Sequence, residues 1–128
     1  IKSLILERDD NLGIFLGEDC HIHPNAILEG PILLGAGCHI GPYAQLTGPL
    51  VIGDRCNIGS RVQISNSVVW SESTLGPNSV LERCILGKAV TVGEGAQINA
   101  DCILGSHATV AEGRRLPIGF SLGSMEIF

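Results

Sequence analysis

The sequence is poor in several features that other classes of protein require. Aromatic residues make up only 4% of the 128 residues, charged residues 16%, and apolar runs extend for only a few residues. A core must therefore be built from aliphatic and small side chains, and the sequence predicts no membrane-spanning segment and no signal peptide. The eight Lys and Arg are scattered and the net charge is −5, so no basic surface for nucleic acid is indicated.

The cysteines also lack a familiar arrangement. Their number, five, is odd, and no Cys-x-x-Cys pair occurs, so the sequence indicates neither a zinc knuckle nor a disulfide framework. Free thiols are typical of a reducing compartment, and we therefore expect a cytoplasmic protein. The chain starts at Ile1 rather than Met, which suggests a segment of a longer protein.

What the sequence has in abundance is repetition. A large side chain recurs at every sixth position from Leu16 to Trp70 and continues, after two one-residue slips, to Leu116. A small or aliphatic residue usually lies two positions earlier, and Gly often follows. Two inward positions around one outward position are typical of a short strand, and Gly suits a corner. A helix is excluded because a period of six matches neither 3.6 nor 3.5 residues.

A longer period of 18 residues indicates that three hexapeptides form one coil. Cys20, Cys38 and Cys56 are spaced in this way, and Gly30-Pro31 recurs as Gly48-Pro49. Stacked coils of this kind stabilise one another, as in other solenoids. The sequence therefore predicts an all-β fold, a parallel β-helix of hexapeptide repeats with a triangular cross-section and about five to six coils.

The repeat divides the chain into three parts. We predict a linker or N-terminal packing segment over residues 1–13, the β-helix over residues 14–116, and a C-terminal closing segment over residues 117–128. Phe120 and Phe128 are candidates to close the end of the core. We place the first slip directly after Trp70, whose side chain is then expected to point inward. The expected inward column comprises Leu16, Leu34, Ile52, Trp70, Leu86 and Leu104.

Some side chains are candidates for chemistry, but each has a simpler structural interpretation. Cys20, Cys38 and Cys56 would stack on one face and could bind metal, yet thiols also fill a narrow core as small apolar groups. His21 and His39 would stack outward without a suitable third ligand. The Gly-rich corners lack the following helix and Lys of a phosphate-binding loop. We therefore assign no catalytic, cofactor-binding or metal-binding residue.

The outward side chains predict one apolar face among three. The column that contains His21 and His39 is polar, and the column that contains Gln45 and Gln63 is mixed. The third column is apolar throughout, and a general preference of branched residues for strands does not explain why only one face has this character. We predict that this face is an interface, formed by Phe15, Leu33, Val51, Val69, Ile85 and Ile103.

Three motifs resemble the C-terminal β-helix of nucleotide-sugar pyrophosphorylases: His23–Pro31, Gly48–Asp54 and Ser65–Trp70. The likeness covers roughly residues 14–112. It is greatest to mannose-1-phosphate guanylyltransferase and to related guanine-exchange subunits of a translation initiation factor, with glucose-1-phosphate thymidylyltransferases nearly as similar. The resemblance implies a left-handed coil, which the period alone does not determine.

The resemblance also implies a function for the segment. In that family a separate N-terminal domain transfers a nucleotidyl group from NTP to a sugar 1-phosphate, and Mg²⁺ belongs to that domain. None of that domain is present in this sequence, so no catalytic residue is carried over and no cofactor is expected here. We expect a non-catalytic oligomerisation or regulatory domain whose partners are a second copy, the parent's catalytic domain, or both, but neither nucleic acid nor a membrane.

An acyltransferase is the alternative function. Many hexapeptide proteins transfer acyl groups with a His general base, often with a loop that protrudes from a corner. In this sequence both irregularities of the repeat are deletions, so no such loop is extruded. A stand-alone hexapeptide-repeat acyltransferase is therefore less favoured than an assembly domain.

Overall fold

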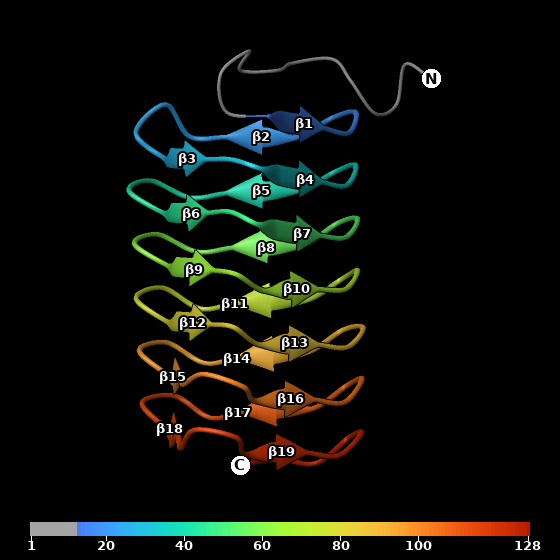
Figure 1. The fold of residues 1–128 in the computed structure, drawn as a ribbon, viewed down its shortest axis with the longest axis vertical. Helices are drawn as coiled ribbons and strands as arrows, with labels where there is room; N and C mark the ends of the chain where they lie inside the picture. Colours follow the sequence, from blue (N-terminus) through green and yellow to red (C-terminus); the bar gives the residue numbers. More distant parts are fainter. Residues whose placement is uncertain (1–12) are drawn as a thin grey trace.

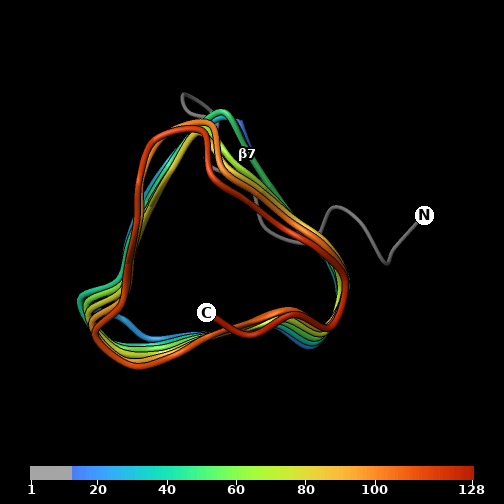
Figure 2. The same cartoon turned by 90° about the horizontal axis from the view of Figure 1, so that it is seen from below.

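A computed structural model describes residues 13–128, so most of the predicted N-terminal segment lies outside the described residues. These residues form 19 short strands and no helix, hence no helix that could cross a membrane. The strands follow one another around a triangular section, coil upon coil (Figures 1 and 2). The predicted parallel β-helix of about five to six coils is therefore confirmed, with about six coils.

Three parallel sheets, named here A, B and C, form the three sides of the triangle. Sheet A contains β1 (Ile14–Leu16), β4 (Ile32–Leu34), β7 (Leu50–Ile52), β10 (Val68–Val69), β13 (Ile85–Leu86), β16 (Ile103–Leu104) and β19 (Ser121–Leu122). Sheet B contains β2 (His21–Ile22), β5 (His39–Ile40), β8 (Asn57–Ile58), β11 (Thr74–Leu75), β14 (Thr91–Val92) and β17 (Thr109–Val110). Sheet C contains β3 (Ile27–Glu29), β6 (Gln45–Thr47), β9 (Gln63–Ser65), β12 (Val80–Glu82), β15 (Gln97–Ile98) and β18 (Arg115–Leu116).

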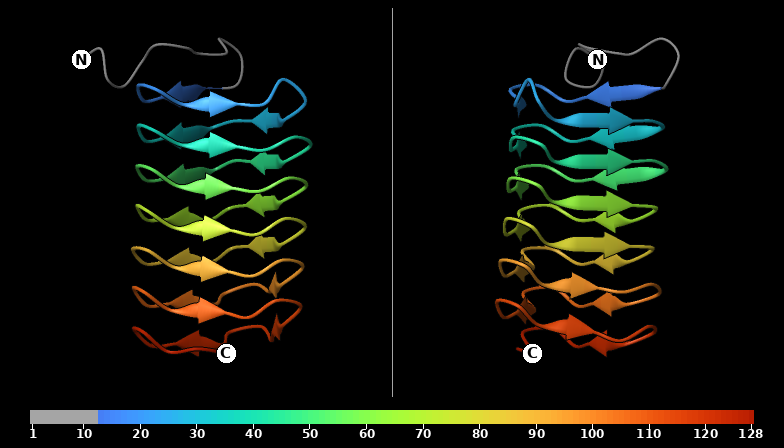
Figure 3. Two further views of the ribbon diagram at one scale, coloured as in Figure 1. Left: turned by 180° about the vertical axis from the view of Figure 1, so that it is seen from behind. Right: turned by 90° about the vertical axis from the view of Figure 1, so that its left-hand side faces the viewer.

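The core is a set of inward columns that run the length of the stack. Each strand pairs with the strand three places away in the chain, so equivalent residues of successive coils lie directly above one another (Figure 3). Aliphatic side chains fill the interior because alternate residues of a strand point to opposite faces. In sheet A the inward column comprises Leu16, Leu34, Ile52, Val69, Leu86, Leu104 and Leu122.

Trp70 is not part of this column, and that prediction was wrong. Val69 pairs with Ile52 and Leu86 and is fully buried, whereas Trp70 is 59% exposed. The first deletion falls before Val69, in the corner that leads into β10, and not after Trp70. The outward residue of β10 is therefore Val68, so Val69 does not belong to the outward apolar face.

Both deletions occur in the same column of corners, between sheets C and A. Asn66 and Arg83 occupy the two shortened corners and have positive φ angles of 51° and 48°. Stacked residues next to these corners are 17 apart in sequence, as for Ser67 and Cys84, instead of 18. Because the missing residues come from corners, the strands on either side keep their register.

Aromatic side chains lie at the C-terminal end of the core. Phe120 and Phe128 pack against the core with ring centroids 5.0 Å apart. The guanidinium of Arg114 lies over the Phe128 ring, 4.4 Å from its centroid. The chain therefore begins a further coil after β18, and Ile127 forms an isolated bridge with Thr109.

Candidate functional site

The outward side of sheet A is apolar from β1 to β16. Pairing of successive strands places its outward side chains in one line along the stack. Leu33 and Val51 are 40% and 42% exposed, and Ile85 and Ile103 are 48% and 52% exposed. With Val68 in place of the predicted Val69, this apolar face comprises Phe15, Leu33, Val51, Val68, Ile85 and Ile103.

Two shallow hollows follow the edge of the apolar face. One, of about 240 Å³, is lined by Phe15, Leu33 and Val51 and by Pro31 and Pro49 of the neighbouring corners. A second, of about 210 Å³, continues from Pro49 towards Val68. Pro31 and Pro49 lie beside the outward side chains, in the corners between sheets C and A that precede the two deletions. The prolines therefore form the edge of the apolar face on the side of sheet C.

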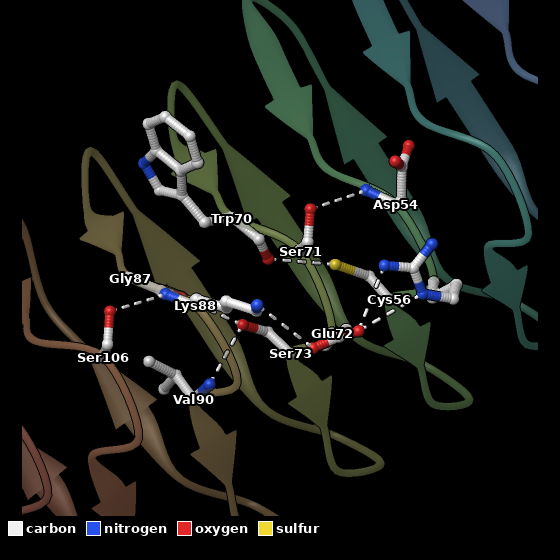
Figure 4. A network of polar contacts seen from close by, with 11 residues as sticks. Asp54, Cys56, Trp70, Ser71, Glu72, Ser73, Gly87, Lys88, Val90 and Ser106 are labelled. Atoms are coloured by element: carbon white, nitrogen blue, oxygen red, sulfur yellow. Dashed lines mark hydrogen bonds and ion pairs between the residues drawn. The ribbon is translucent and has the colours of Figure 1, made fainter.

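Trp70 lies at the opposite edge of the apolar face. The alternation along β10 directs Val68 outward and Val69 inward, so Trp70 is the next outward residue. Figure 4 shows its indole ring pointing away from Glu72. An exposed tryptophan beside a row of aliphatic side chains is the composition found at the centre of protein interfaces.

The position of Trp70 is occupied by Gly in the other coils. The amide of each of these residues donates to the carbonyl of an inward residue in the next coil, as for Gly53 with Val69 and Trp70 with Leu86. A Cβ on Gly53 would lie 2.7 Å from the nitrogen of Ser71, too close for an undisturbed coil. The glycines at this corner are Gly17, Gly35, Gly53, Gly87, Gly105 and Gly123.

A polar network lies in the corner beside Trp70 (Figure 4). Glu72 accepts a hydrogen bond from Arg55 at 3.0 Å, and its other oxygen is 3.8 Å from the Lys88 ammonium. These three side chains are between 41% and 60% exposed, so their ion pairs contribute little to stability. The network is an ordinary solvated corner and provides no arrangement for catalysis.

The outward side of sheet B has the predicted polar ladder. The rings of His21 and His39 stack with centroids 4.8 Å apart and an angle of 11° between their planes. They border an open hollow of about 410 Å³ that continues to Asn57. Among residues 13–128, no group of three or more His, Cys, Asp or Glu side chains is arranged to hold a metal ion.

The cysteine column consists of thiols that fill the core. Cys38 and Cys56 are buried and donate to the carbonyls of Gly53 and Trp70 at 3.1 and 3.2 Å. Directly before β13, burial raises the pKa of the Cys84 thiol to about 11. A buried, protonated thiol is a poor nucleophile and a poor metal ligand, so Cys84 is a packing residue.

Sequence reasoning missed three buried serines in the central coils. Ser73 occupies the same inward column as Cys56, and its hydroxyl donates to the Gly87 carbonyl and accepts from the Val90 amide, each at 3.1 Å. Ser67 and Ser79 also donate to backbone carbonyls. The signal was present in the sequence, since each serine lies two positions before a large inward residue, where other coils mostly have Cys, Ala or an aliphatic residue.

Comparisons with known proteins identify one family and a group of similar folds. The model of the left-handed β-helix (LbH) domain of EIF2B subunit epsilon matches residues 11–116, which is most of the chain. No curated protein sequence matches significantly. The family match agrees with the triangular coil and assigns it the left hand that the sequence resemblance implied.

Solved structures with the same fold are hexapeptide-repeat transferases. A mutant of perosamine N-acetyltransferase from Caulobacter crescentus, in complex with CoA and GDP-perosamine, superposes with a TM-score of 0.77 and 20% identity over 83% of this chain. A hexapeptide transferase family protein from Anaplasma phagocytophilum gives 0.73 and 20% over 90%. The chain covers 51% and 74% of these proteins, respectively. Identities of this size establish a shared fold and not a shared chemistry.

Proposed function

The chain belongs to the family of left-handed β-helix domains of EIF2B subunit epsilon, and we propose that it is a non-catalytic oligomerisation and regulatory domain. Its parent protein would also carry a sugar-1-phosphate nucleotidyltransferase domain, of the kind found in mannose-1-phosphate guanylyltransferase. The apolar face of sheet A carries this proposal, because it offers a surface for a partner and no group for catalysis.

The size of the apolar face indicates what it can do. Six stacked strands at ~4.8 Å make a strip about 24 Å long, and strands of two or three residues make it about 7–10 Å wide. At ~25 cal/mol per Å², burying such a strip is favourable by a few kcal/mol on each partner. Association itself costs ~4–15 kcal/mol, so the contact needs either further surface or a covalent link between the partners. Both are available when the partner is a domain or subunit of the parent.

The proposed partners are the parent's own N-terminal catalytic domain, a second copy of the parent, or both. The parent's Mg²⁺ would be held in that catalytic domain and not by the β-helix. Five free cysteines are in keeping with a reducing compartment, and we propose that the parent is cytoplasmic.

Charge introduced into the apolar face tests the proposal. In the parent protein, Val51→Glu with Ile85→Glu should dissociate the assembly or loosen the domain arrangement, which sedimentation velocity would detect as smaller or more extended species. Each new carboxylate would lose its hydration in the contact without gaining a partner. Val51 and Ile85 are directed away from the core and are partly exposed, so circular dichroism should be unchanged.

A matched variant on sheet B provides the control. Asn57→Glu with Thr91→Glu changes the same two coils on the polar side of the triangle. This variant should sediment like the wild type. If both variants behave alike and like the wild type, the apolar face is not an interface and the proposal fails.

A stand-alone acyltransferase is the second candidate. It is favoured by the hollow beside His21 and His39, since His serves as a general base in acyl transfer. The test is acetyl-CoA turnover by the purified chain with amino-sugar acceptors. Turnover that disappears in His21→Ala or His39→Ala would favour this candidate over the assembly domain.

A further inference from the structure

We propose that the apolar face of sheet A, together with Trp70, binds one amphipathic α-helix that lies along the axis of the β-helix. This inference rests on the proposed function and specifies the occupant of the same surface. The helix belongs to the parent protein, covalently joined to the β-helix, and presents a single stripe of aliphatic side chains.

The direction of the occupant follows from the shape of the face. Each strand of sheet A from β1 to β16 contributes one outward apolar side chain. These strands are stacked along the long axis of the molecule (Figure 1), so the line of side chains runs across the strands. An element that lay parallel to the strands would contact only one or two members of the face. An element that contacts Phe15, Val68 and Ile103 together must lie along the stack.

The spacing of the side chains favours a helix over an extended strand. The outward side chains of sheet A follow one another every ~4.8 Å. One face of an α-helix presents a side chain about every 5.4 Å, whereas same-face residues of a strand are ~6.6 Å apart. Over the five intervals of the face, the side chains of a helix shift by about 3 Å relative to those of sheet A, and the side chains of a strand shift by about 9 Å. A helix of roughly 16 residues covers the whole strip, since each residue adds ~1.5 Å.

The width of the face matches a single helix. The strip is about 7–10 Å wide, and an α-helix with its side chains is ~10–12 Å across. Pro31 and Pro49 bound the N-terminal half on the side of sheet C, and Trp70 stands at the opposite edge near the centre of the stack. These boundaries favour one helix over a broader layer of two helices or a sheet.

The indole of Trp70 provides an anchor for the helix. At the equivalent corner the other coils have Gly, and a Cβ on Gly53 or Gly105 would meet backbone of the next coil at 2.7 or 2.6 Å. Trp70 therefore occupies a corner position at which the close approach of the next coil favours Gly, and its side chain is exposed. Departures from a local structural rule are expected at functional positions, and exposed Trp is the residue most enriched among interface anchors.

A second copy of the same face is a poorer occupant. A stable dimer buries ~800 Å² on each partner, and a strip of about 24 by 7–10 Å with one indole provides well under that area. A helix that is covalently tethered to the β-helix binds at a high effective concentration and needs less surface.

Fusion of a designed peptide to the 128-residue chain tests this inference. A flexible Gly/Ser linker joins the C-terminus to a 17-residue segment of Leu, Glu, Lys and Ala with Leu on one helical face, because the tether supplies the effective concentration that the strip needs. The emission of Trp70, the single tryptophan, should shift to the blue, and far-ultraviolet circular dichroism should show added helix. A fusion of the same composition, with Leu distributed around the helix, should do neither.

Variants identify the surface. Val51→Glu with Ile85→Glu should weaken binding of the fused peptide by ~100-fold or more, because each buried carboxylate costs at least ~1.4 kcal/mol. Trp70→Ala should weaken it by ~30-fold, the value for an anchor of ~2 kcal/mol. Asn57→Glu with Thr91→Glu should leave it unchanged.

Three results would overturn the inference: equal binding of both fused peptides, no binding of the amphipathic fused peptide, or burial of Trp70 in a dimer without peptide. If the glutamate pair on sheet A disrupts the parent's assembly while the peptide fails to bind, the proposed function stands and the helix is excluded.

Discussion

Sheets A and B have the same architecture and opposite outward surfaces. In both, successive coils pair in register around an inward column of aliphatic side chains. Outside, sheet A presents Leu33, Val51 and Ile85, while sheet B presents His39, Asn57 and Thr91 in the same coils. The fold therefore depends on the inward residues, and the outward residues are free to differ with function. The first two predictions below separate these two sets of residues.

The largest effect is expected inside the core. Ile58 is buried on the inward side of sheet B, and Ile58→Ala should lower the free energy of unfolding by ~2–5 kcal/mol through the cavity it leaves. Ile103→Ala, on the outward side of sheet A, should cost much less because Ile103 is half exposed. Urea denaturation of both variants measures the difference. Equal losses would mean that inward and outward positions contribute alike.

A smaller effect is expected at the corner that contains Trp70. Gly53→Ala should destabilise by ~1–3 kcal/mol, since the added Cβ would lie 2.7 Å from the Ser71 nitrogen and must displace the next coil. Trp70→Ala, at the equivalent corner of the next coil, should change the unfolding free energy by less than ~0.5 kcal/mol. Thermal melts of the two variants would show the contrast. A large loss with Trp70→Ala would assign the indole a structural role and weaken its assignment as an anchor.

A pH-dependent effect is expected at Cys84, which is buried directly before β13. Burial raises the pKa of Cys84 from 9.0 to about 11, so the folded state holds this proton more tightly than the unfolded state. The resulting stability is fully present below pH ~9 and is lost as the pH rises through about 11. Urea melts at pH 8 and pH 10.5 should show a decrease that is smaller in Cys84→Ser. Serine is accommodated at the equivalent position of the preceding coil, as Ser67. An unchanged decrease in Cys84→Ser would contradict the assignment.

The smallest effect is expected at the exposed corner network. Glu72→Gln removes the ion pairs with Arg55 and Lys88, and all three side chains are largely solvated. The loss should be below ~1 kcal/mol and should vanish at high salt, because exposed ion pairs are screened. Melts at low and high ionic strength measure it. A loss as large as that of Ile58→Ala would show that this corner supports the coil.

The inward and outward columns could be derived from the sequence because each coil repeats the same chemistry. The polar ladder of His21 and His39 and most of the apolar face followed directly from the period of 18. The error at Trp70 arose because bulky residues stand at both 69 and 70, so the pattern alone fits a deletion on either side. Only the pairing of Val69 with Ile52 and Leu86 decides between them.

The glycine rule at the corner between sheets A and B was only partly visible in the sequence. The recurrence of Gly was clear, but the reason for it is the close approach of the next coil, which no single chain segment reveals. From the sequence alone, Trp70 is one more large residue in a column. The short distance between a corner Cβ and the next coil shows that Trp70 is an exception to the preference for Gly at this corner.

Because the coils stack at a constant rise, the length of the apolar face is proportional to the number of coils. Each coil adds one outward side chain and ~4.8 Å to its length, while its width and its chemistry stay the same. Insertion or loss of a single coil would therefore change the reach of the face in one fixed step. The protein can match the length of a partner by the number of its coils, independently of the residues that hold each coil together.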